Sequence, residues 1–104
     1  MTIQLNTDNN LNIHESFGQE LEDLLTGELS RFSENITSLE VHLSDENGGK
    51  EGQNDKRCMI EARLEGRQPI AVTAEADTHE QSVAEAIDKL KNVLDTILGR
   101  LRNH

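Results

Sequence analysis

Hydrophobic residues recur along this chain with two different spacings, and the changes of spacing divide it into strands and helices. In four short stretches apolar and polar residues alternate, which is the pattern of a strand with one buried face. In two longer stretches apolar residues recur every three or four positions, as on one face of a helix. The order along the chain is strand, helix, three strands and helix.

The alternating stretches predict four strands. The first is short, at Ile3 to Leu5, with Leu11 and Ile13 beyond an asparagine-rich stretch. The other three have inward-facing sets Leu39, Val41 and Leu43; Cys58, Ile60, Ala62 and Leu64; and Ile70, Val72, Ala74 and Ala76. Residues 46–55 read ENGGKEGQND, with three glycines and no apolar residue. We expect a flexible hairpin loop there.

The first helical stretch is predicted to run from about Glu15 to Ser33. Its apolar stripe consists of Phe17, Leu21, Leu24, Leu25, Leu29 and Phe32. Gly18 and Gly27 each lower helix stability by about 1 kcal/mol relative to alanine, so packing must hold this helix in place. Its outer face is acidic and carries Glu20, Glu22, Asp23 and Glu28.

The second helical stretch opens with a capping signal, Thr78 followed three residues later by Gln81. Its apolar stripe consists of Val83, Ile87, Leu90, Leu94, Ile97 and Leu101. Each flank of this stripe carries two basic residues, Lys89 and Arg100 on one side and Lys91 and Arg102 on the other.

These elements predict an α+β fold of βαβββα order. A sheet with one polar face buries two amphipathic helices when both pack on its apolar face. We therefore expect a two-layer sandwich with a four-stranded mixed sheet and both helices on one side. The 104 residues form one domain, residues 1–104, on this view.

The charge of the chain limits its partners. Ten Lys and Arg stand against twenty Asp and Glu, for a net charge of −10. Such a chain repels nucleic acid at long range unless its few positive charges are grouped. Two Phe and no Trp or Tyr leave no aromatic platform for stacking bases.

Catalytic and metal sites have little support in the residues. The four histidines show no ligand spacing with one another or with Cys58, which alternates with core positions and is expected to be buried and inert. No glycine-rich loop opens a helix, and no pair of carboxylates is singled out for acid–base chemistry. We expect a protein that is not an enzyme and needs no metal or cofactor.

The expected location of the protein rests on features that the sequence lacks. No apolar run is long enough to span a bilayer, and MTIQLNTDNN lacks the basic and apolar regions of a secretory signal. A single cysteine suits a reducing compartment. We expect a cytoplasmic monomer.

Four segments carry a resemblance to a known family. ITSLEVHLSD, DKRCMIEARL, QPIAVTAEA and DTHEQSVAEAIDKLKNVLDTILGRL together are similar to the ribosome hibernation promoting factor and ribosome-associated inhibitor family, also called sigma-54 modulation proteins. The most specific part is the ending, in which HE leads a helix through AID to a leucine-rich tail. The resemblance covers nearly the whole chain and corresponds to a short form.

The resemblance implies a function. Members of this family bind the small ribosomal subunit and sterically block the channel for messenger and transfer RNA under stress. They are not enzymes and need no cofactor. For this chain it implies contact with ribosomal RNA, and no role for DNA or membranes.

The chain departs from the family in its charges. Family members have a basic first helix, whereas this one is acidic with Arg31 as its only cation. In the last helix Val93 and Thr96 stand where the family has Lys and Arg. The remaining candidates for contact with RNA are Lys89, Lys91, Arg57, Arg63, Arg67, Arg31, Arg100 and Arg102. We expect Lys89 and Lys91, with Arg57 and Arg63 on the sheet, to matter most.

An alternative interpretation of these cations is structural. The lysines and arginines of the last helix can pair with the acidic face of the first helix or with Asp88 and Asp95. Arg57 and Arg63 can pair with glutamates on neighbouring strands. The chain would then be an acidic protein-interaction module with the same fold and with reduced or lost RNA binding, acting through a protein partner on its sheet face or its helix pair.

Overall fold

The predicted order of elements is confirmed in the structure, a computed structural model that describes residues 1–7, 15–45 and 55–102. The elements are β1 (Thr2–Thr7), α1 (Glu15–Glu28), a 3-10 helix η1 (Ser30–Phe32), β2 (Ile36–Asp45), β3 (Lys56–Leu64), β4 (Ile70–Ala76) and α2 (His79–Arg102). Leu11, Ile13 and most of the expected hairpin loop lie outside the described residues.

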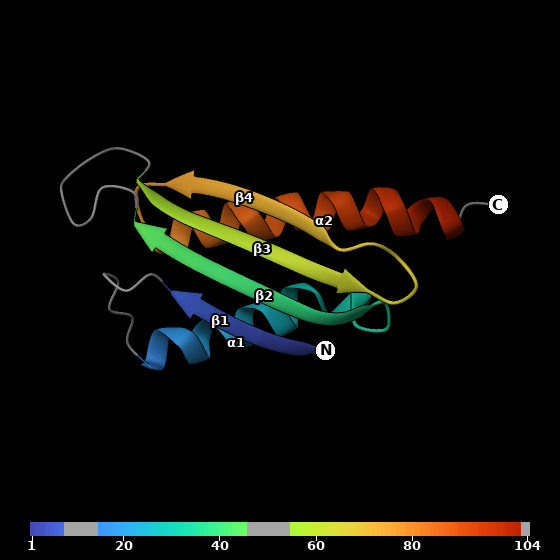
Figure 1. Cartoon of the computed structure of the whole chain (residues 1–104), viewed down its shortest axis with the longest axis horizontal. Coiled ribbons are helices and arrows are strands. Elements are labelled where there is room, and N and C mark those ends of the chain that lie inside the picture. Colours follow the sequence, from blue (N-terminus) through green and yellow to red (C-terminus); the bar gives the residue numbers. More distant parts are fainter. Residues whose placement is uncertain (8–14, 46–54, 103–104) are drawn as a thin grey trace.

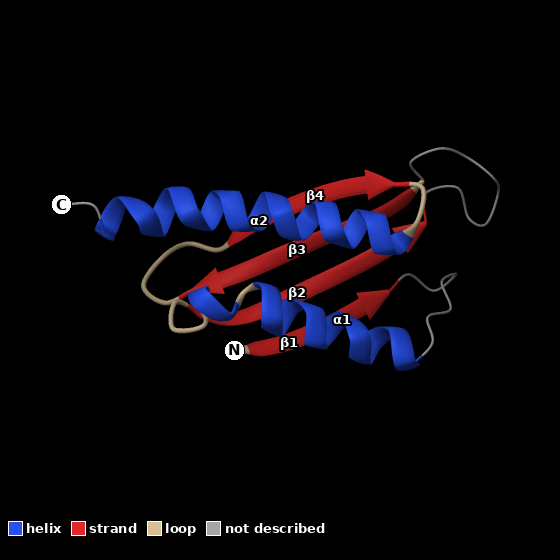
Figure 2. Ribbon diagram, turned by 180° about the vertical axis from the view of Figure 1, so that it is seen from behind, coloured by secondary structure: helices blue, strands red, loops and turns tan. Residues whose placement is uncertain are grey.

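The four strands form one mixed sheet in the order β1-β2-β3-β4. β1 is parallel to β2, and the other neighbours are antiparallel. Both helices lie on one face of this sheet, and the other face is open (Figures 1 and 2). The two-layer α+β fold predicted from the spacing of apolar residues is therefore correct.

The core lies between the sheet and the two helices. The inward residues of β2 and β3 are nearly all inaccessible to solvent, and Leu90 and Leu94 of α2 are fully buried above them. The stripe of α2 differs from the prediction at its end. Leu98, with 6% of its surface exposed, is buried, whereas Ile97 is partly buried. Leu98 follows Leu94 by four residues and so stays closer to the stripe as the helix turns.

The first helix is shorter than predicted and ends at Glu28 instead of Ser33. The Leu29 amide still donates to the Leu25 carbonyl at 3.0 Å, but the Phe32 amide then donates to Leu29, three residues back, at 3.0 Å. In a 3-10 turn residues three apart eclipse one another. This tightening keeps Phe32 below Leu29 in the core, so both are buried although the α-helix has ended.

Leu24 was predicted to be in the buried stripe and is instead 44% exposed. At 100° per residue it lies at the edge of the stripe defined by Leu21 and Leu25, which are 3% and 0% exposed. α1 therefore presents one leucine to solvent on the side that faces α2.

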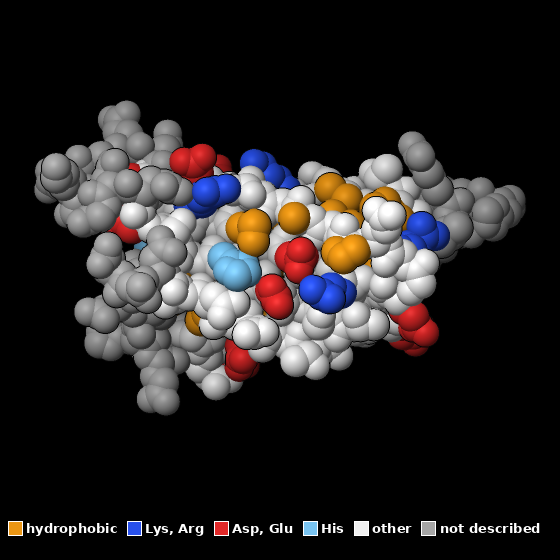
Figure 3. Space-filling view, in the orientation of Figure 1, with side chains coloured by type: hydrophobic (Ala, Val, Ile, Leu, Met, Phe, Trp, Pro, Cys, Tyr) orange, Lys and Arg blue, Asp and Glu red, His pale blue; other side chains and the backbone are white. Residues whose placement is uncertain are grey.

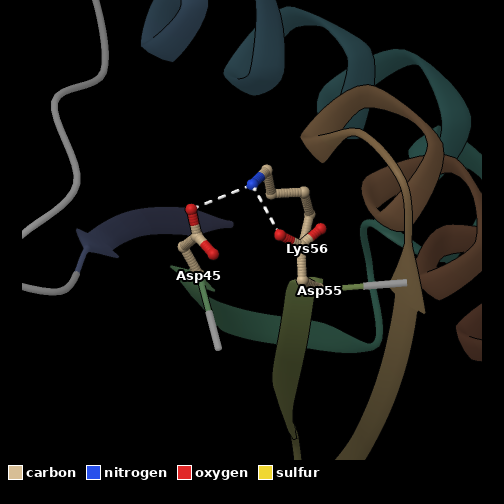
Figure 4. A network of polar contacts seen from close by, with 3 residues as sticks. All are labelled: Asp45, Asp55 and Lys56. Atoms are coloured by element: carbon tan, nitrogen blue, oxygen red, sulfur yellow. Dashed lines mark hydrogen bonds and ion pairs between the residues drawn. The ribbon is translucent and has the colours of Figure 1, made fainter. Parts of the chain in front are cut away.

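Asp55 was assigned to the loop and is instead only 4% exposed, directly before β3. The Lys56 ammonium donates to Asp55 at 3.1 Å and to Asp45 at 2.9 Å (Figure 4). Hydrogen bonds to Asp45 and Asp55 raise the pKa of Lys56. Lys56 thus links the end of β2 to the start of β3 and is held in the fold by two carboxylates.

Candidate nucleic-acid interface

Lys89 and Lys91 point to opposite sides of α2, because two residues along a helix are about 200° apart. The Lys89 ammonium donates to the Thr73 carbonyl of β4 at 2.8 Å. The Lys91 ammonium lies 3.3 Å from a carboxylate oxygen of Glu28 in α1. Pairing with the acidic first helix is thus confirmed for Lys91, and these two lysines do not form a common site.

Arg57 and Arg63 lie on the open face of β3, where acidic, basic and hydrophobic side chains are interspersed (Figure 3). Arg57 is opposite Glu75 in the register with β4. Arg63 was expected to pair across strands, but its Nε atom lies 3.8 Å from Glu61 on the same strand, since its neighbour on β2 is Ser38. The Arg63 side chain remains 59% exposed.

The middle of the open face is acidic. Glu40 and Glu61 are directly opposite one another on β2 and β3. His42 lies beside them, with its Nε2 atom 3.5 Å from Glu40, and faces Met59 across the strands. A shallow hollow of about 240 Å³ borders His42, Arg57 and Met59. Because like charges meet at its centre, this face does not form a continuous phosphate-binding track.

Arg31 makes a contact that the sequence did not indicate. Its guanidinium forms two parallel bonds of 2.7 and 2.9 Å to the carboxylate of Asp95 in α2. It also lies over the Phe32 ring, 4.3 Å from the centroid. The hydrogen bond to Asp95 raises the pKa of Arg31. The side chain is still 54% exposed, so it fastens η1 to α2 while facing solvent.

Arg67 is exposed in the turn between β3 and β4. The residue before it, Gly66, has φ of 72°, a conformation that glycine adopts without strain. The turn is closed by the Arg67 amide, which donates to the Leu64 carbonyl at 3.3 Å, and the Glu65 amide donates to Asn35 at 3.0 Å. A hollow of about 520 Å³ separates this turn from Leu98 of α2.

Three distant segments therefore meet at one end of the molecule, which we call the turn end: residues 30–38, 61–69 and 91–102. They are joined by the Arg31–Asp95 pair and the Asn35–Glu65 bond, and α2 extends past the sheet there (Figure 1). These segments contain six basic and four acidic residues, whereas the rest of the chain contains four and sixteen. The turn end is thus less acidic than the rest of the chain taken together.

The turn end holds most of the candidate cations. Arg31, Arg63, Arg67 and Lys91 are described there. Arg100 and Arg102 lie in the last turn of α2, and their side chains are outside the description. Arg57 and Lys89 do not belong to it.

His79, the first residue of α2, was considered in the sequence only as a metal ligand and as part of the HE signature. Both of its ring nitrogens are shielded from solvent and have no hydrogen-bond partner among the described residues. Burial, followed by the nearby charge of Lys56, lowers the pKa of His79, and Asp45, Asp55 and Glu80 oppose that effect. The imidazole is therefore held neutral in the fold.

We expect the neutral His79 to make folding sensitive to mild acid. The unfolded chain, in which the pKa is near 6.5, binds a proton that the folded chain does not, so the free energy of unfolding falls as the pH drops below that value. His79→Phe should flatten this dependence between about pH 7 and 5, measured by urea unfolding. His42→Phe, on the exposed sheet face, is the matched control. An equal slope in wild type and His79→Phe would contradict the assignment.

The described part of the chain shows no reactive cysteine, metal site or membrane-spanning helix. Cys58 is fully buried, and burial raises its pKa to about 12, so the thiolate needed for nucleophilic chemistry does not form near neutral pH. Within residues 1–7, 15–45 and 55–102 no three His, Cys, Asp or Glu side chains are grouped as a metal site. The helices in those ranges are also too short or too polar to cross a membrane.

Comparisons with known proteins agree with the resemblance. Two solved structures share the fold, the Thermus thermophilus Protein Y N-terminal domain (TM-score 0.72, 22% identity, 93% of this chain and 99% of that one) and a ribosomal subunit interface protein from Coxiella burnetii (0.74, 19%, 95% and 99%). No curated protein matches the chain significantly in sequence. The model of one family matches residues 5–102. The chain therefore belongs to the sigma 54 modulation protein / S30EA ribosomal protein family.

Proposed function

We propose that this protein associates with the small ribosomal subunit and inhibits translation by occupying the channel for messenger and transfer RNA under stress. The family match over residues 5–102 supports the association. The charge distribution supports a specific orientation. In the turn end basic residues outnumber acidic ones, in contrast to the rest of the chain taken together, so it faces the RNA phosphates.

In this mechanism the protein acts by steric exclusion. The contact residues are the cations of the turn end, among which Arg63 and Arg67 are exposed in the structure. They bind phosphate oxygens through charge-assisted hydrogen bonds, which fix the position of the domain without reading sequence. The packed body then excludes RNA from the space it fills, and no catalytic group is needed.

A second candidate function is an acidic protein-interaction module without RNA binding. The observation in its favour is α1, which carries five acidic and no basic residues. Lys91 and Arg31 are also already paired with carboxylates. In that case the ribosome contact of the family would be weakened or lost in this chain.

Ionic strength separates the two functions. If RNA phosphates carry the contact, co-sedimentation with purified small subunits should weaken steeply between about 50 and 200 mM salt, with a log–log slope of about −0.7 to −0.9 per phosphate. A contact made mainly through apolar protein surface changes little over that range. Absence of sedimentation at every salt concentration, or sedimentation that salt does not affect, would rule out the RNA contact.

A further inference from the structure

A small groove lies between α1 and the first turns of α2. Its apolar lining consists of Phe17, Leu21 and Leu24 from α1 and Val83 from α2, around a hollow of about 110 Å³. The two helices lie side by side along the sheet (Figure 2), with Phe17 near Val83 at one end and Glu28 against Lys91 at the other. A volume of this order holds one apolar side chain, since a cavity of about 150 Å³ accepts benzene.

The groove leaves one leucine, Leu24, partly uncovered. It is 44% exposed, although its neighbour Leu25 is fully buried. Among the described residues it shares that degree of exposure with only one other large hydrophobic residue, Met1. When another apolar side chain covers a half-exposed leucine beside an apolar hollow, the free energy becomes more favourable by about 25 cal/mol for each Å² of apolar surface removed from water.

The walls of the groove carry negative charge from both helices. Glu20 of α1 and Glu80 of α2 border the hollow from opposite sides. Within the described part of the chain neither carboxylate has a basic partner, in contrast to Glu28, which binds Lys91. The groove thus combines an apolar floor with two unneutralised carboxylates.

We propose that this groove binds a basic protein segment, which inserts one aliphatic side chain beside Leu24 and places Lys or Arg side chains against Glu20 and Glu80. RNA does not fit, because the two carboxylates at the rim of the hollow repel phosphate. A second copy of this chain does not fit either, since each carries a net charge of −10 and would meet the same acidic walls.

The groove is distinct from the proposed RNA contact. It lies against the first turns of α2, at Glu80 and Val83, whereas the turn end contains the second half of that helix. Both surfaces can be occupied at once. The inference goes beyond the proposed function, because it assigns the acidic helix layer a protein partner even when the turn end is bound to RNA.

The test needs no ribosome. The probe is a synthetic amphipathic peptide with leucine at every third or fourth position and lysine elsewhere, titrated into ¹⁵N-labelled protein. We expect amide shifts to concentrate on residues 17–24 of α1 and 80–84 of α2. A peptide with serine at the leucine positions should bind at least about tenfold more weakly, since the apolar anchor is lost.

Charge variants separate the groove from general attraction to an acidic protein. Glu20→Lys with Glu80→Lys should weaken peptide binding about tenfold. Glu22→Lys with Glu85→Lys changes the net charge equally on residues of the same helices that do not line the groove, and should weaken it less than about twofold. Equal weakening by both pairs, shifts centred on the sheet face, or the same amides responding to a short single-stranded RNA would overturn the proposal.

Discussion

Leu90→Asp should unfold this protein. Leu90 is fully inaccessible in the middle of α2 and packs into the single core between helices and sheet. Removing a buried leucine side chain alone costs about 2–5 kcal/mol, and an unpaired carboxylate in its place adds a desolvation penalty. A domain of this size is stable by only about 5–15 kcal/mol. Circular dichroism should show loss of the cooperative thermal transition or a greatly lowered midpoint.

Leu24→Asp provides the matched control on the other helix. Leu24 is also a helical leucine, but it is 44% exposed, so the same substitution should cost about 1 kcal/mol or less and leave a cooperative transition. The comparison tests the assignment of the two faces of the helix layer. A Leu90→Asp protein that melts cooperatively near the wild-type temperature would show that α2 is packed on a different face.

The sequence was sufficient for the fold because the signals involved are local. The alternation of Leu39, Val41 and Leu43 and the three-to-four spacing of Leu90 and Leu94 each follow from the geometry of one element. The Thr78 hydroxyl does accept the Gln81 amide at 3.1 Å, as the capping signal predicted. Such features need no knowledge of the neighbouring elements.

The errors arose where a second element decides the outcome. Helix periodicity placed Leu24 with Leu25, but Leu24 borders a hollow between α1 and α2 and remains exposed. Asp55 looked like a loop residue, since its burial depends on Lys56 reaching both Asp45 and Asp55 across the ends of two strands. Ile97 and Leu98 are both apolar, and it is Leu98 that is buried in the core.

The candidate site was least accessible to sequence reasoning. All eight cations could be named, but their grouping depends on segments that are about thirty residues or more apart in the chain, such as Arg31 and Asp95. Lys89 and Lys91 were already expected on opposite flanks of the last helix, but their partners, the Thr73 carbonyl of β4 and Glu28 of α1, depend on the neighbouring elements. The folded arrangement instead brings Arg31, Arg63, Arg67 and Lys91 to the turn end.

Reversing charge at the turn end should therefore have the largest effect on ribosome association. Arg63→Glu with Arg67→Glu removes two accessible cations from the region where basic residues outnumber acidic ones. Each phosphate contact contributes about one order of magnitude to the association constant at low salt, so we expect about a hundredfold weaker co-sedimentation with small subunits. The log–log salt slope should also become shallower by about two contacts.

Arg57→Glu with Lys89→Glu is the control, because it changes the net charge by the same amount outside the turn end. If the whole-molecule charge governed association, the two double variants would weaken it equally, since both make an acidic protein more acidic. If the turn end binds RNA, the control should retain most of the wild-type association and its salt slope. Thermal midpoints near that of the wild type would show that neither pair acts through unfolding, because exposed charges contribute little to stability. Full association of the Arg63→Glu, Arg67→Glu protein would place the RNA contact elsewhere on the molecule.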